Sequence, residues 1–253
     1  MKPYFEQDGV TIYHCACVDV LGTMAPRSVK IIITDPPYTE STHKAARTNK
    51  GKVGGSAPKQ IDFPSMSAQE IGLAFDAMSR VVNRWIIATV AYQHAAGLEA
   101  DPPRGGRFVR CGAWAKIAPV PQMNADRPGM GWEAIAILHA NSGEKMRWNG
   151  GGRSAVWTHR AEMNGEYPTQ KPEPLINDFI SDFADPGDDI LDPFMGSGTT
   201  LLCGWRRGHR VTGCDIREAA CEIAAKRIEQ AMRQGRMPFV PVPTRKDQTA
   251  LGF

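Results

Sequence analysis

Short apolar runs alternate with longer amphipathic stretches along most of the chain, and this alternation predicts an α/β fold in which helices connect parallel strands. The seven predicted strands are 10–13, 29–34, 85–90, 108–114, 132–139, 189–191 and 210–214. The predicted helices are 68–81, 173–183, 199–207 and 217–234. A stretch with Pro and Gly but no helical period separates strands 108–114 and 132–139, so we expect these two to pair antiparallel at one sheet edge.

Three segments show neither the apolar periodicity of a helix nor that of a strand. Residues 39–60 are polar and too long for an ordinary connection, which predicts either a functional lid or a partly disordered segment. Residues 141–167 contain three consecutive glycines among basic and aromatic residues, and we interpret them as a small target-recognition insert. The proline-containing residues 236–253 are expected to form a C-terminal extension, which leaves 1–235 as a single domain.

Composition narrows the class of protein. Apolar residues make up 42% of the 253 residues and charged residues 23%, with a net charge of +3, as in ordinary globular proteins. No apolar run approaches the roughly 20 residues of a membrane span, and the start carries no apolar signal segment. The six cysteines include no Cys-x-x-Cys pair. We therefore expect a soluble, cytoplasmic protein with reduced thiols.

The tetrapeptide Asp35-Pro36-Pro37-Tyr38 directly follows the predicted strand 29–34, where open α/β sheets bind their ligands. Two prolines fix the backbone and remove two N–H donors, so the carbonyls of this turn only accept hydrogen bonds. Such a turn suits an exocyclic amine, because a carboxylate and a carbonyl can stabilise its nitrogen as it becomes tetrahedral. Tyr38 offers a ring on which a base can stack. An incidental turn at a strand end is the alternative.

The segment 192–200, Asp-Pro-Phe-Met-Gly-Ser-Gly-Thr-Thr, leads from a strand into a helix. Its glycines let the backbone approach a ligand, and the helix start presents free N–H groups. It is neither a P-loop, because no Lys follows Gly198, nor a full dinucleotide fingerprint, because Leu201 occupies the third glycine position. Asp215 ends the next strand about 20 residues on, where a carboxylate binds ribose hydroxyls. The alternative is a structural turn with Asp215 as a helix cap.

These acids would share one pocket in the folded sheet. Asp35, Asp192 and Asp215 all end predicted strands, so the pocket walls would be acidic. Acidic walls suit a cationic sulfonium better than a pyrophosphate.

The two motifs together resemble the DNA amino-methyltransferases that use S-adenosylmethionine, in the permuted (beta) group where the catalytic motif precedes the cofactor motif. The segments 12–30, 114–133 and 169–172 are similar to further parts of that group, in the same order and over most of the chain. The resemblance implies a Rossmann-like, seven-stranded, mostly parallel sheet with an antiparallel terminal hairpin and a circularly permuted strand order.

The resemblance also implies site residues. Asp35, Pro36, Pro37 and Tyr38 would hold the flipped base and form the catalytic turn. Gly196, Ser197 and Gly198 would wrap the methionine part of the cofactor, Asp215 would bind its ribose, and Lys171 could approach its carboxylate. The full set expected to bind the cofactor is Lys171, Asp192, Phe194, Gly196, Ser197, Gly198, Thr199 and Asp215.

One position departs from the group. Where relatives commonly have Gly-Asp-Cys, this chain has Cys15-Ala16-Cys17, so the acid expected near the adenine of the cofactor is absent, and Asp19 or a backbone group is the substitute. The two cysteines and His14 lack the spacing of a metal-ligand pair. We expect the cysteines to alternate along a strand as small buried side chains, and we expect no metal.

Two basic segments are expected to contact double-stranded DNA, because a base inside a duplex must be extruded before an enzyme can reach its amine. Residues 41–59 contain no acid, and we expect phosphate contacts across a closing lid from Lys44, Arg47, Lys50 and Lys52. A merely solvated loop is the alternative. In the second segment we expect Arg147, Trp148 and Arg153 to read the target, unless its tryptophans pack it onto the sheet.

The sequence thus predicts an enzyme that methylates adenine N6 in DNA. Asp at position 35 favours adenine, and cytosine N4 is the second choice. A DNA-binding relative without turnover, supported only by Ala16, is a further alternative. Relatives that act on protein glutamine or RNA usually carry Asn before Pro-Pro. The chain leaves no room for a large recognition domain, so a short target site, relaxed specificity or a second subunit in a homodimer remain open.

Overall fold

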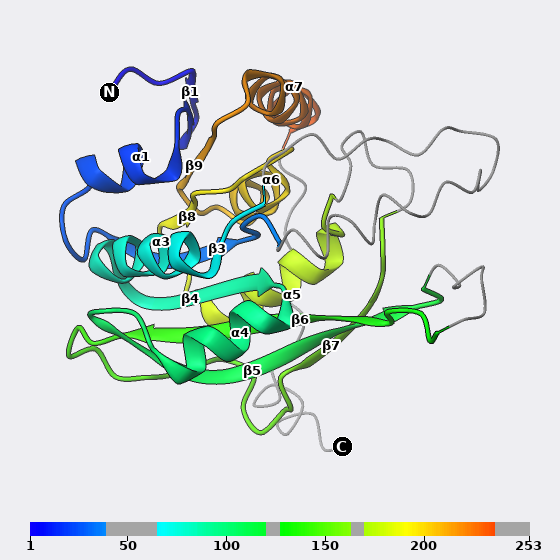
Figure 1. The fold of residues 1–253 in the computed structure, drawn as a ribbon. Helices are drawn as coiled ribbons and strands as arrows, with labels where there is room; N and C mark the ends of the chain where they lie inside the picture. The colour runs from blue at the N-terminus through cyan, green and yellow to red at the C-terminus, as the bar shows by residue number, and fades with distance from the viewer. Residues whose placement is uncertain (39–64, 120–126, 163–169, 236–253) are drawn as a thin grey trace, which may run out of the picture.

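The computed structural model describes residues 1–38, 65–119, 127–162 and 170–235, and its backbone forms one nine-stranded sheet flanked by helices (Figure 1). The strands are β1 (Phe5–Gln7), β2 (Val10–His14), β3 (Val29–Thr34), β4 (Val82–Val90), β5 (Gly106–Ile117), β6 (Trp132–Ala140), β7 (Val156–Arg160), β8 (Ile190–Asp192) and β9 (Val211–Asp215). The helices are α1 (Cys17–Thr23), α3 (Ala68–Val81), α4 (Tyr92–Ala100), α5 (Glu173–Phe183), α6 (Thr199–Arg206) and α7 (Glu218–Gln234). The predicted lid 39–60 and the predicted extension 236–253 lie outside the described residues.

The strand order is β1-β2-β9-β8-β3-β4-β6-β5-β7. The five strands from β2 to β4 in this order run parallel, and β6 runs antiparallel to both of its neighbours. All seven predicted strands are present, but the predicted total of seven is wrong, because β1 and β7 complete a sheet of nine. The antiparallel pairing of β5 with β6 is confirmed, but its place at the edge is wrong, since β7 pairs with the outer side of β5.

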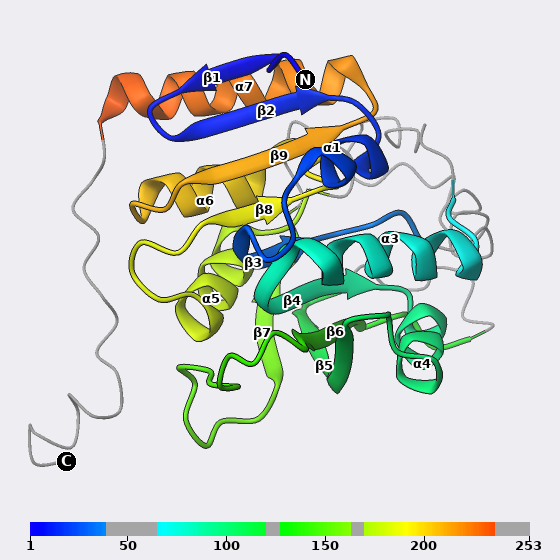
Figure 2. The ribbon, with the colours of Figure 1, turned by 90° about the vertical axis from the view of Figure 1, so that its left-hand side faces the viewer.

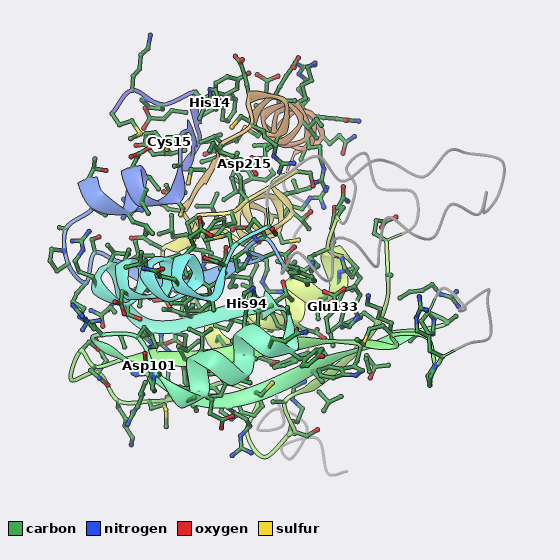
Figure 3. All side chains as sticks on the ribbon, viewed as in Figure 1. His14, Cys15, His94, Asp101, Glu133 and Asp215 are labelled. Atoms are coloured by element: carbon green, nitrogen blue, oxygen red, sulfur yellow. The ribbon has the colours of Figure 1, made fainter. Side chains whose placement is uncertain are left out.

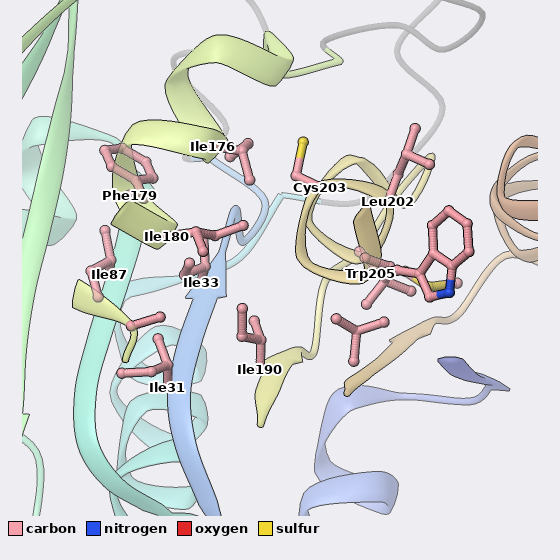
Figure 4. Packing of buried hydrophobic residues seen from close by; sticks show 14 of the residues in the cluster. Ile31, Ile33, Ile87, Ile176, Phe179, Ile180, Ile190, Leu202, Cys203 and Trp205 are labelled. Atoms are coloured by element: carbon pink, nitrogen blue, oxygen red, sulfur yellow. The ribbon is translucent and has the colours of Figure 1, made fainter. Parts of the chain in front are cut away.

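Helices cover both faces of the sheet: α5, α6 and α7 lie on one, and α1, α3 and α4 on the other (Figure 2). Successive strand residues point to opposite faces. Ile31 and Ile33 of β3 therefore pack with Phe179 of α5 in one core, whereas Ile32 packs with Phe75 of α3 in the other. Figure 4 shows the first of these cores.

The strands β3 and β8 are parallel neighbours, but the helices that follow them lie on opposite faces of the sheet. After β3 the chain passes through α3 to β4, and after β8 it passes through α6, on the other face, to β9. Where two crossovers diverge in this way, a crevice opens beyond the carboxyl ends of the two strands. The fold therefore places a binding site at the ends of β3 and β8. None of the described helices is long and apolar enough to cross a membrane.

Candidate active site

A cavity of about 580 Å³ lies at the carboxyl ends of β3, β8 and β9. The three acids that end or follow these strands, Asp35, Asp192 and Asp215, all line it, as the sequence predicted. The opposite half of the sheet contributes Glu133, from the start of β6; Figure 3 labels Glu133 and Asp215. One cavity thus joins the turn 35–38, here called the Asp35 turn, and the loop 192–199, here called the glycine loop. These two segments are more than 150 positions apart in the chain.

Asp35 is held by a hydrogen bond and an ion pair. The hydroxyl of Thr89 on β4 donates to Oδ1 at 2.5 Å, and the ammonium of Lys171 lies 2.6 Å from Oδ2. Burial raises the pKa of Asp35 above its usual value, and the nearby Lys171 cation opposes this rise. Pro36, Pro37 and Tyr38 also line the cavity.

Lys171 lines the cavity and pairs with two acids. Its ammonium lies 2.6 Å from the carboxylate of Asp35 and 3.4 Å from that of Glu133. Burial lowers the pKa of Lys171, but these two carboxylates outweigh burial and raise it above its usual value. Lys171 is therefore cationic and paired with the carboxylate of the Asp35 turn in this structure.

Glu133 has a role that the sequence reasoning missed. The hydroxyl of Tyr38 donates to Oε2 of Glu133 at 2.5 Å, and Lys116 lies 2.7 Å from Oε1. Burial raises the pKa of Glu133, but the ammonium groups of Lys171 and Lys116 outweigh it and lower the pKa to about 2. A permanently ionised carboxylate therefore fixes the hydroxyl end of Tyr38.

Asp192 organises the turn that begins the glycine loop. Its Oδ1 accepts hydrogen bonds from the hydroxyl of Thr34 at 2.8 Å and from the N–H of Phe194 at 3.1 Å. Burial raises the pKa of Asp192 to about 7. Phe194 lines the cavity beside it.

The glycine loop is shaped by contacts with α7. Gly198 has a φ of +74°, and a Cβ there would lie 2.8 Å from the Cβ of Ala224, so only glycine fits without displacement. The guanidinium of Arg227, which the sequence reasoning also missed, donates to the carbonyl of Ser197 at 2.6 Å and to the hydroxyl of Thr199 at 3.2 Å. Arg227 thereby holds the loop against α7.

Asp215 connects the glycine loop to the turn before α7. It lines the cavity, and its Oδ2 accepts a hydrogen bond from the N–H of Gly196 at 3.1 Å, which ties the glycine loop to β9. Its Oδ1 accepts hydrogen bonds from the backbone and the side chain of Arg217, at 2.9 and 3.1 Å. The carboxylate therefore also fixes the turn before α7.

The position of the missing acid, Ala16, lines the same cavity together with Cys17. The expected strand alternation of the cysteines is wrong, because β2 ends at His14 and Cys17 begins α1. Cys15 and Cys17 are half-buried, and Asp19 is exposed in the first turn of α1. All six cysteines are free thiols, and the described residues contain no cluster of three or more side chains suited to a metal ion.

The structure describes one of the two basic segments. Lys44, Arg47, Lys50 and Lys52 lie outside the described residues. Because β6 runs antiparallel to β4, the chain that follows β6 leaves at the end of the sheet opposite the cavity. There the side chain of Arg147 binds Asp185 at 2.8 Å, and the indole N–H of Trp85 donates to the carbonyl of Arg147. The structure therefore does not bring Arg147 to the site.

The neighbours of Arg147 pack in the same region. Trp148 packs against Phe183, with ring centroids 5.8 Å apart, and Arg153 pairs with Asp182. This arrangement matches the alternative in which the tryptophans pack the segment onto the sheet. The strand β7 then carries the chain back to the cavity, which Ala161 and Glu162 line.

Comparison with known proteins shows that this chain is similar to DNA methyltransferases. Residues 113–226 match a family model described as DNA methylase. The chain is 28% identical over 252 residues to the Type II methyltransferase M2.DpnII of Streptococcus pneumoniae, an alignment that covers 90% of this chain and 92% of that protein. Residues 113–226 are thus similar to a DNA methylase domain, and the chain as a whole is similar to a Type II methyltransferase. A second relative, the Type II methyltransferase M2.LlaDCHI of Lactococcus lactis subsp. cremoris, is 26% identical over 92% of the chain and 94% of that protein.

Solved structures show the same fold as this chain. The M1.HpyAVI–SAM complex superposes with a TM-score of 0.61 at 22% identity, over 86% of this chain and 99% of that one. The PvuII DNA methyltransferase, described as cytosine-N4-specific, superposes with a TM-score of 0.65 at 13% identity, over 90% and 93% of the two chains. These likenesses extend over most of the chain and not only over the Asp35 turn.

Proposed function

We propose that this protein transfers a methyl group from S-adenosylmethionine to the exocyclic N6 of adenine in double-stranded DNA. The observation that carries the proposal is that a single cavity contains both the Asp35 turn and the glycine loop. The first is suited to an aromatic amine and the second to a nucleoside-containing ligand. The match of residues 113–226 to a family model described as DNA methylase supports the same reaction.

The cavity fits the cofactor in size and in chemistry. Its volume of about 580 Å³ lies within the range of small-molecule sites. The N-terminus of α6 offers backbone N–H groups, and Asp215 offers a carboxylate to the ribose. When bound, S-adenosylmethionine supplies an electrophilic methyl group on a positively charged sulfur. The acidic side chains around the cavity stabilise such a positive charge.

Asp35 is the group that acts on the amine. Its carboxylate accepts one N–H of the amine, and the carbonyl of Pro36 accepts the other, which favours the tetrahedral nitrogen over the planar one. When the nitrogen bonds to the methyl carbon, it must lose one proton. Asp35 is placed to take this proton, and its raised pKa makes it a stronger acceptor than an exposed aspartate.

Tyr38 positions the base. Its ring lines the cavity, and the hydrogen bond to Glu133 keeps the ring from rotating away. A base extruded from the duplex can stack on this face while its amine reaches Asp35. We further propose that Lys44, Arg47, Lys50 and Lys52 contact the phosphates beside the extruded base.

Cytosine N4 is the second candidate substrate. The same turn can hold the amine of cytosine, and a cytosine-N4-specific enzyme shares the fold. Asp at position 35 favours adenine, because relatives that act on cytosine N4 more often carry Ser there. This preference for adenine rests on the motif Asp35-Pro36-Pro37-Tyr38, whereas the PvuII enzyme shares only the fold.

Methylation of bulk DNA tests the proposal. The purified protein is incubated with S-adenosylmethionine and unmethylated genomic DNA, which is then digested to nucleosides and examined by mass spectrometry. We expect N6-methyladenine. N4-methylcytosine would replace the first choice by the second, and the absence of any methylated base would disprove both.

A further inference from the structure

Four partly buried charged side chains form a chain at the cavity, and methyl transfer itself does not explain them. Asp35, Lys171, Glu133 and Lys116 follow one another with successive N–O distances of 2.6, 3.4 and 2.7 Å. Two anions and two cations balance the charge of this chain. The four residues come from the end of β3, the start of α5, β6 and β5, so the whole fold is needed to assemble them.

In the described structure, the ammonium of Lys171 is bound to the carboxylate of Asp35, which is the group that the proposed function assigns to the target amine. Oδ1 of Asp35 already accepts the hydroxyl of Thr89, and Oδ2 is bound by the Lys171 ammonium. An incoming amine presents the same kind of N–H donor to the same oxygen. Lys171 and the amine therefore compete, unless the ammonium has another partner nearby.

We propose that Glu133 is a positioning residue that receives Lys171 when the target amine binds Asp35, an inference that rests on the proposed function. The ammonium lies between the two carboxylates, 2.6 Å from Asp35 and 3.4 Å from Glu133, so a movement of about 1 Å exchanges its partner. A lysine can make this movement because its ammonium is a point charge on a flexible stem.

Glu133 is well suited to receive the cation. Lys116 holds its Oε1 and the Tyr38 hydroxyl its Oε2, so the carboxylate stays in place while Lys171 moves. Charge remains balanced throughout, which matters because an unpaired charge in a buried site is costly. Because Tyr38 binds the same carboxylate, the residue that stacks the base and the residue that receives Lys171 are mechanically linked.

The variant Glu133→Gln tests the proposal through the pH dependence of turnover. The charged or titratable groups that face Asp35 are Lys171, Glu133, Tyr38 and Asp192. Removing the negative charge of Glu133 lowers the pKa of Asp35, so the acid limb of the kcat profile should move to lower pH. With no anion to receive Lys171, kcat at the plateau should fall by about tenfold or more. The KM for S-adenosylmethionine should stay within about twofold of that of the wild type.

Three further variants complete the test. Glu133→Asp restores the charge and should recover part of kcat together with the wild-type acid limb. Glu144→Gln makes the same chemical change in a surface pair with Lys30 and should leave both quantities unchanged. In Lys171→Arg the planar guanidinium can bind both carboxylates at once, so it should remain on Asp35 and lower kcat.

The outcomes separate this inference from the proposed function. A wild-type protein that methylates no DNA overturns the proposed function and this inference with it. An active wild type whose Glu133→Gln variant keeps its kcat and its acid limb overturns the inference alone. If Glu133→Gln fails to fold by circular dichroism, Lys171→Arg decides, and wild-type turnover in that variant overturns the inference.

Discussion

At the scale of single residues, the proposed function makes Asp35 the group on which turnover should depend most directly. Asp35→Ala should lower kcat by about 10²–10⁴, because the amine then lacks both a hydrogen-bond acceptor and a proton acceptor. Binding of S-adenosylmethionine, measured by calorimetry, should change little. Thr89→Val removes only the hydroxyl that donates to Asp35 and should cost about tenfold. A large loss of cofactor binding in Asp35→Ala would show that this residue serves the cofactor instead.

Asp192 should lower the free energy of unfolding as pH rises, whereas an aspartate with a lowered pKa in the folded protein raises it. Its pKa is raised to about 7 in the folded protein from a usual value of 3.8, so its protonated form favours the folded state. This contribution is complete below pH 3.8 and is lost as pH rises through about 7. Asp192→Asn keeps an oxygen for Thr34 and Phe194 but cannot ionise.

We therefore expect Asp192→Asn to raise the melting temperature relative to the wild type more at pH 8 than at pH 5, as measured by differential scanning calorimetry of the unliganded protein. Glu173→Gln, which changes a carboxylate on the surface of α5, is the control and should show no such trend. A gain that is equal at both pH values would mean that Asp192 is ionised throughout.

At the scale of elements, the glycine loop depends on its contact with α7. Gly198→Ala introduces a Cβ 2.8 Å from Ala224 at a φ of +74°, whereas Gly208→Ala introduces one at a φ of +84° with no atom within 4 Å. In both variants an alanine must adopt a positive φ, which should lower the free energy of unfolding by about 1–2 kcal/mol. Only Gly198→Ala adds overpacking of about 1–3 kcal/mol.

Urea unfolding should therefore show a larger loss of unfolding free energy for Gly198→Ala than for Gly208→Ala, and calorimetry should show weaker cofactor binding only for Gly198→Ala. Equal losses in the two variants would mean that the loop adapts around the added methyl group.

The strength of the local signals decides which elements the sequence predicts. The predicted helix 68–81 matches α3 to the residue, because Ser67 and Glu70 form a capping box ahead of a clear amphipathic pattern. The sequence does not predict α4, because this helix has no capping side chain and no apolar face that its sequence alone reveals. It does not predict β7 either, because the five residues of this strand follow a glycine-rich stretch that contains no periodic pattern.

The site shows the same limit. The acids Asp35, Asp192 and Asp215 are recognisable because each ends or follows a strand. Glu133 lies at the start of one, and its place follows from pairing: β6 runs antiparallel to β4, so its start lies beside the end of β4, and β4 is the neighbour of β3. Side chains alternate between the two faces of β6, so Glu133 lies on the same face as the apolar Ile135 and Ile137. An acid in line with buried apolar residues is a signal in the sequence that predicts a functional carboxylate.

At the scale of the whole molecule, the two basic segments should fail differently when mutated. Replacing Lys50 and Lys52 by Ala should weaken binding to all DNA sequences and lower the salt dependence by about 0.9 for each phosphate that is no longer neutralised. Arg147 lies at the end of the sheet opposite the cavity, where its ion pair with Asp185 serves packing. Arg147→Ala should leave the methylated sequence motif unchanged in modified-base sequencing of cells that express the protein. A changed motif would show that the segment reaches the target despite its distance from the cavity.

The strands β8 and β9 lie between β2 and β3 in space, although they are the last of the described strands in the chain. A ribosome therefore releases β2 and β3 long before the strands that join them. Until residues 190–215 emerge, β2 and β3 keep unpaired edges, which are prone to pair with other chains. The sheet closes only when these late strands insert, and pairing over such long sequence separations is slow. Synthesis thus completes the glycine loop and the centre of the sheet in the same step, so a chain cut short before residue 190 lacks both and keeps the edges of β2 and β3 unpaired.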